Sequence, residues 1–80
     1  MAQIKVLLPQ WGMGMSEGKI TKWYKNVGDS VIEDEPLADV ETEKVTSTIE
    51  SPGTGQLSKI FIFEGETAAV RTLIAIIEKE

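Results

Sequence analysis

An internal repeat constrains the fold of this 80-residue chain more than any other feature. The second half matches the first without gaps at an offset of 37 residues, the separation of Gly18 from Gly55. The matched pairs are Gly18 with Gly55, Ile20 with Leu57, Lys22 with Lys59, Gly28 with Gly65, Asp29 with Glu66, Ser30 with Thr67, Ala38 with Ala75 and Glu41 with Glu78. The sequence therefore predicts two copies of one unit, each too small to bury its apolar face alone.

Each unit has the pattern of β-strands. Apolar and polar residues alternate, as in Ile4, Val6 and Leu8, and turn-forming residues recur about every eight to twelve positions. We expect strands over residues 3–8, 18–25, 30–33, 37–42, 45–50, 55–62, 67–70 and 73–78. The predicted fold class is all-β: a sandwich or barrel of two four-stranded antiparallel sheets related by pseudo-two-fold symmetry.

The repeat also predicts two local features. The apolar rhythm slips by one residue between Ile20 and Trp23, and it slips at the equivalent place in the second copy, which indicates a repeated β-bulge. Lys44 lies in the connection between strands 37–42 and 45–50, and the equivalent place in the second copy is the chain end. We therefore expect Lys44 at one pole of the domain and both termini at the other.

Composition narrows the chemistry. The chain has no Cys and no His, so disulfides, thiolate nucleophiles and the usual zinc ligands are excluded, and we expect neither catalytic residues nor a metal site. Eight Lys and Arg against 13 Asp and Glu give a net charge of -5, which argues against nucleic acid and anionic membranes as partners. No apolar run approaches the length of a membrane span, and no signal peptide is visible.

The connection at Lys44 departs from ordinary turn chemistry. A two-residue hairpin connection normally uses Gly or Asn, because its backbone needs positive φ angles, but Glu43 and Lys44 stand here. One interpretation is a charged tip that discourages strand-edge pairing. The other is that the side chains themselves are required at this place.

These residues belong to a longer pattern. Residues 39–45, followed by 49–55, resemble the lipoyl-attachment signature of lipoyl domains, and residues 8–18 and 27–31 resemble the usual opening of those domains. The resemblance covers residues 4–78. A small departure from the pattern is found at Glu43 and Val45, where many members carry Asp and Ala.

The resemblance implies a flattened barrel in which lipoic acid is attached through an amide bond to Lys44 at a hairpin tip, as N6-lipoyllysine. It implies a swinging-arm carrier that is not itself an enzyme. The implied partners are a thiamine-dependent decarboxylase, an acyltransferase core and dihydrolipoamide dehydrogenase, with a lipoate ligase or octanoyltransferase for attachment. Residues 1–80 would form one lipoyl-attachment domain, at the N-terminus of a dihydrolipoamide acyltransferase from a 2-oxo acid or acetoin dehydrogenase complex. The expected location is the prokaryotic cytoplasm, or the mitochondrion if a leader has been removed.

Further residues acquire candidate roles from the resemblance. Six acids stand between Glu33 and Glu43, and we expect Glu41 and Glu43 to help the attaching enzyme recognise Lys44; the alternative is a solvated face that blunts strand edges. Trp11 and Met13 are candidates for recognition by the decarboxylase, against the alternative of a loop folded over the core.

Two other functions are kept as alternatives. A biotin carrier domain has the same fold but carries Met-Lys-Met at the modified site, and Glu43-Lys44-Val45 lacks both methionines. In an unmodified β-barrel interaction domain, Lys44 would be only a turn residue.

Overall fold

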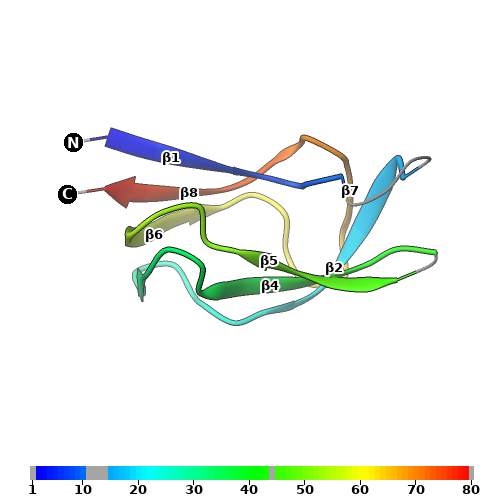
Figure 1. Cartoon of the computed structure of the whole chain (residues 1–80), viewed down its shortest axis with the longest axis horizontal. Helices are drawn as coiled ribbons and strands as arrows, with labels where there is room; N and C mark the ends of the chain where they lie inside the picture. The colour runs from blue at the N-terminus through cyan, green and yellow to red at the C-terminus, as the bar shows by residue number, and fades with distance from the viewer. Residues whose placement is uncertain (1, 11–14, 44, 80) are drawn as a thin grey trace.

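The two copies of the repeat form two four-stranded antiparallel sheets that face each other (Figure 1). The computed structural model describes residues 2–10, 15–43 and 45–79. Its strands are β1 (Ala2–Leu7), β2 (Glu17–Trp23), β3 (Ser30–Val31), β4 (Pro36–Glu41), β5 (Thr46–Glu50), β6 (Gly55–Ile60), β7 (Thr67–Ala69) and β8 (Leu73–Lys79). The strand order is β1-β8-β6-β3 in one sheet and β5-β4-β2-β7 in the other. The predicted all-β fold class is confirmed.

The strand predictions are confirmed in number and order. The main differences are at three C-terminal ends, because β2 stops at Trp23, β3 at Val31 and β6 at Ile60, each before the predicted end. At the ends of β2 and β6 the chain bends away toward equivalent turns that contain Gly28 and Gly65. Alternation of side chains alone does not reveal where such a bend begins.

The predicted bulges are present at equivalent places in the two sheets. The register of β2 with β4 shifts between Ile20 and Lys22, and the register of β6 with β8 shifts between Leu57 and Lys59. An inserted residue of this kind strengthens the local strand twist. The bulges therefore help two short sheets to curve around one core.

The symmetry extends to the backbone of the turns. Gly28 and Gly65 have φ angles of 101° and 88°, a conformation that glycine adopts without steric cost. The Gly28 N–H donates to the Leu57 carbonyl at 2.7 Å, and the Gly65 N–H donates to the Ile20 carbonyl at the same distance. Each turn is thus bonded to a strand of the opposite copy, which joins the two halves.

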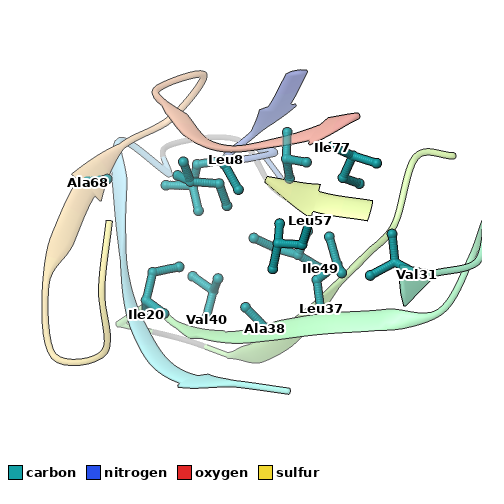
Figure 2. Packing of buried hydrophobic residues seen from close by; sticks show 13 residues of the cluster. Leu8, Ile20, Val31, Leu37, Ala38, Val40, Ile49, Leu57, Ala68 and Ile77 are labelled. Carbon is teal, nitrogen blue, oxygen red and sulfur yellow. The ribbon is translucent and has the colours of Figure 1, made fainter. Parts of the chain in front are cut away.

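Both sheets contribute side chains to a single core (Figure 2). Leu8, Ile20, Leu37, Val40, Leu57 and Ile77 are fully buried within it. Trp23 is half-buried against this cluster, and its indole N–H donates to the Ile62 carbonyl at 2.9 Å. Core packing thus fixes the relative position of the two sheets.

The molecule is elongated, with principal extents of 36 × 20 × 19 Å. The tip of the β4–β5 hairpin occupies one end, and the paired chain ends, where Ala2 faces Lys79, occupy the other (Figure 1). Lys44 lies outside the described residues, but its described neighbours Glu43 and Val45 belong to this hairpin. The hairpin and the chain ends therefore lie at opposite poles, as the repeat predicted. The described part of the chain contains no helix with the length and apolar character that a membrane span requires.

Candidate functional site: the β4–β5 hairpin tip

The candidate site is the connection between β4 and β5. The last paired residues of the ladder are Glu41 and Thr46. Beyond them, the Thr42 N–H donates to the Val45 carbonyl at 2.8 Å. The Thr42–Val45 bond closes a two-residue connection, Glu43 and Lys44, of the length that the sequence predicted.

The side chain of Thr42 completes this closure. Its Oγ1 accepts a hydrogen bond from the Val45 N–H at 3.2 Å and donates one to the Val45 carbonyl at 3.0 Å. A hydroxyl can make both bonds at once, because it has one donor and two acceptor lone pairs. Side-chain hydroxyls of Thr often bond nearby backbone groups in turns. This contact provides a physical reason why the connection does without Gly or Asn.

The structure places the two predicted recognition carboxylates beside the tip. Glu41 ends β4, where it lies between Lys19 of β2 and Thr46 of β5 in the sheet register, and its side chain is exposed. Glu43 is exposed as well, within the connection. A field from two exposed carboxylates can steer a basic partner, and salt weakens such a field.

The other acids of the run from Glu33 to Glu43 do not all approach the tip. Glu33, Asp34 and Glu35 precede β4, whose six residues separate them from the tip by roughly 20 Å at ~3.3 Å per residue. Glu35 forms an ion pair with Lys25 at 3.3 Å. The acidic run is therefore divided between the two ends of β4, because an extended strand separates its first members from its last.

Asp39, midway along β4, has a structural role on the outer face of the sheet. Its Oδ2 accepts a hydrogen bond from the Tyr24 hydroxyl at 2.7 Å, and its Oδ1 accepts one from the Thr48 hydroxyl at 2.9 Å. The bond from Tyr24, and secondly that from Thr48, lowers the pKa of the Asp39 carboxyl, while the bond to Asp39 raises the pKa of Tyr24. The Lys22 ammonium lies 4.9 Å from the centre of the Tyr24 ring.

These contacts join β2, β4 and β5 around one carboxylate. The sequence interpretation did not identify Tyr24 or Thr48. The position of Thr48 could have been predicted from the sequence. A hairpin with a two-residue connection has a fixed register, and in that register Thr48 lies directly opposite Asp39. Tyr24 lies beyond the end of β2, so pairing rules alone do not place it near Asp39.

The two candidates for partner recognition, Trp11 and Met13, lie outside the described residues. Met15, the first described residue after that segment, is half-buried. Its Cε lies 3.5 Å from the position that a Cβ would occupy on Gly18. β2 begins at the end of the molecule where the hairpin lies (Figure 1).

Other kinds of site find no support in the residues that the structure describes. Among them, no group of three or more acidic side chains is placed to hold a metal ion. An open groove of about 520 Å³ is lined by β3, the start of β6 and Lys79. This groove lies at the pole of the chain ends, away from the hairpin tip.

Comparison with known proteins agrees with this geometry. A family model named for biotin and lipoyl attachment, described as "Biotin-requiring enzyme", matches residues 4–77. The chain belongs to this family of carrier domains, in which a cofactor is attached to the protein. Within it the chain is a lipoyl domain, since its relatives are dihydrolipoyllysine acyltransferase components and a solved lipoyl domain has the same fold.

Three relatives illustrate the similarity. The acetyltransferase component of the acetoin cleaving system of Pseudomonas putida is 37% identical over 78 residues, which cover 96% of this chain and 21% of that protein. The succinyltransferase component of the 2-oxoglutarate dehydrogenase complex of Rickettsia conorii is 44% identical over 68 residues, which cover 85% of this chain and 17% of that protein. The acetyltransferase component of the pyruvate dehydrogenase complex of Corynebacterium glutamicum is 46% identical over 72 residues (90% and 11%).

The fold has a solved counterpart. The lipoyl domain of the 2-oxoglutarate dehydrogenase complex of Azotobacter vinelandii superimposes with a TM-score of 0.74 and 26% identity, covering 99% of this chain and 98% of that one. By contrast, the chain spans only about a fifth or less of the length of the three acyltransferase components. The similarity is therefore to one domain of those proteins.

Proposed function

We propose that Lys44 is the residue that carries the lipoyl group, and that the domain delivers it as a swinging arm within a 2-oxo acid or acetoin dehydrogenase complex. The observation that carries the proposal is the closed hairpin tip, whose described residues Glu43 and Val45 are both exposed at a pole of the molecule. A group attached there can be reached by large enzymes without a clash with the sheets. The most protruding connections of a β-sandwich commonly carry such functions.

The tip suits an amide-linked group, which needs an accessible amine and no enclosing pocket. When bound, lipoic acid supplies a dithiolane that takes up an acyl group with its own reduction. The chain's own contribution is to hold the attachment point on a rigid hairpin and to offer Glu41 and Glu43 to partner enzymes. Carriers of this kind leave the chemistry to the cofactor.

Attachment needs a separate enzyme. A lysine amine is almost wholly protonated at neutral pH, with about one molecule in 2,500 unprotonated at an ordinary pKa. The attaching ligase or transferase would remove this proton to its own base, and the amine nitrogen would then attack the carbonyl carbon of an activated lipoyl or octanoyl group. The new amide bond forms as the bond to the leaving group, AMP or a carrier thiol, breaks.

The remaining assignments are proposed from the resemblance to lipoyl domains. The proposed partners are the thiamine-dependent decarboxylase, the acyltransferase core and dihydrolipoamide dehydrogenase, and Trp11 and Met13 are proposed contacts for the decarboxylase. We further propose that residues 1–80 are the N-terminal domain of an acyltransferase chain in the prokaryotic cytoplasm, or in the mitochondrion after loss of a leader. Relatives from acetoin, pyruvate and 2-oxoglutarate systems show comparable identity.

Intact mass spectrometry tests the attachment site. The protein is expressed in cells supplied with lipoate and able to attach it, and compared with Lys44→Arg and with Lys59→Arg, which removes an exposed lysine of β6. We expect a lipoyl adduct on the wild type and on Lys59→Arg, and none on Lys44→Arg. A biotin adduct would favour the biotin carrier instead, and an unmodified wild type would favour the interaction domain.

A further inference from the structure

Thr42 joins the two sides of the hairpin connection through both its backbone and its side chain. Its backbone N–H and its side-chain Oγ1 together make three hydrogen bonds to the backbone of Val45, at 2.8, 3.2 and 3.0 Å. Both polar backbone groups of Val45 are thereby held by a single residue. Thr42 is half-buried, whereas Glu43 and Val45 are exposed, so this closure lies at the base of the tip rather than in the surface that a partner would touch first.

The closure matters because the connection lacks the residues that make such turns rigid by themselves. Without Gly or Asn, the backbone of a two-residue connection is not biased toward the positive φ angles of tight hairpins. Where backbone propensity does not select one conformation, a side-chain bond can select it. Removal of the hydroxyl would release one hydrogen bond from each backbone group of Val45 and admit other conformations of the connection.

We propose that Thr42 is a positioning residue for the modification of Lys44. Its hydroxyl forms hydrogen bonds with both backbone groups of Val45 and thereby holds the connection in the conformation that the attaching enzyme selects. This inference rests on the proposed function. It assigns a role in attachment to a residue that neither carries the cofactor nor contributes charge to recognition.

The proposal predicts which kinetic constant changes. An enzyme that binds only the closed tip has an apparent affinity reduced by the fraction of molecules in which the tip is closed. A net hydrogen bond changes such an equilibrium by a few-fold, so the loss of two corresponds to about tenfold. The loss of the two bonds lowers the closed fraction by up to this factor, and by most when open tips predominate. The defect should therefore appear as a rise of up to about tenfold in KM, with kcat retained at saturating domain, because the tips that are bound are closed.

The test uses lipoate, ATP and a purified lipoate ligase, with the unmodified domain as the varied substrate. Thr42→Val keeps the shape of the side chain and removes the hydroxyl, and Thr42→Ser restores the hydroxyl. Thr48→Val is the matched control, because it removes a Thr hydroxyl from the same hairpin. The Thr48 hydroxyl donates its hydrogen bond to Asp39 and makes none to the tip. Circular dichroism and thermal melting establish that each variant is folded at the assay temperature.

We expect Thr42→Val to raise KM by more than twofold and up to about tenfold, and Thr42→Ser and Thr48→Val to remain within about twofold of the wild type, the scale of a weak net hydrogen bond. Equal KM values for Thr42→Val and the wild type would overturn the inference, as would a Ser variant as impaired as the Val variant, or a loss confined to kcat. A wild-type domain that the ligase does not modify would instead overturn the proposed function, so the two failures are distinguishable.

Discussion

Among the glycines that the structure describes, Gly55 is the one where an added methyl group should cost most. It begins β6 and pairs across the sheet with Val31 of β3. A Cβ on Gly55 would overlap the carbonyl oxygen of Glu78 and lie 2.9 Å from both the Glu78 carbonyl carbon and Ile77 Cγ2. Two of these three atoms belong to the backbone of β8, so no side-chain rotation relieves the overlap, and β6 must move away from β8.

The structure allows the size of this effect to be estimated. Overpacking of a well-packed site costs about 1–3 kcal/mol, and a clash with a strand backbone belongs at the upper end, at about 3 kcal/mol. For a domain of this size, each kcal/mol shifts the melting temperature by about 4–8 °C, so Gly55→Ala should melt roughly 12–24 °C below the wild type.

Gly53→Ala is the matched control. A Cβ on Gly53 would lie 2.5 Å from Ile4 Cδ1, the far end of a side chain that can rotate. We expect this variant to lose less than about 1 kcal/mol, the scale of an ordinary point substitution. Differential scanning calorimetry and urea unfolding measure both variants. A Gly55→Ala protein as stable as Gly53→Ala would show that the approach of β8 to Gly55 is not close enough to constrain the fold.

Two further predictions concern charge. The pKa of Asp39 is lowered chiefly by the Tyr24 hydroxyl, so this bond stabilises the fold above the ordinary Asp pKa of about 3.9, and the benefit disappears as the pH falls through the lower folded value. Urea unfolding across pH should therefore show Tyr24→Phe to be less stable than wild type near neutrality, with the gap closing in acid; a gap independent of pH would contradict this. Glu41→Gln and Glu43→Gln should each slow attachment by a few-fold at low salt and less at high salt, whereas Glu33→Gln, at the far end of β4, should not. The rate of lipoyl attachment is measured by stopping the reaction at timed intervals. Equal rates for the three Gln variants would show that the carboxylates beside the tip have no role in recognition.

Much of the fold could be predicted because the sequence contains its strand unit twice. Ile20 and Leu57 mark equivalent bulges in the two copies. The slip in apolar alternation that indicates a bulge is weak in one segment alone, but it occurs in both. The repeat also placed the hairpin and the chain ends at opposite poles. Neither inference required knowledge of which side chains touch.

The features that could not be predicted depend on distances between residues. The six acids appear as one cluster in the sequence, yet the whole length of the extended strand β4 separates Glu33 from Glu43. The hydrogen bonds between the Thr42 hydroxyl and Val45 depend on the side-chain rotamer of Thr42. The alternation of apolar and polar residues in the sequence carries no information about that rotamer. The cost of a methyl group at Gly55 depends on how closely β8 passes it.

The pairing of Ala2 with Lys79 gives the domain the properties of a spacer. Lys79 is separated from Thr42 by the repeat offset of 37 residues, so the paired chain ends occupy in one copy the place that the hairpin tip occupies in the other. Any tether joined to either end leaves from the pole opposite the tip, and the long axis of the domain, with an extent of 36 Å, is added to the reach of whatever the tip carries. The body of the domain would therefore extend the reach of a group attached at the tip, and a tether behind the domain would have less distance to cover.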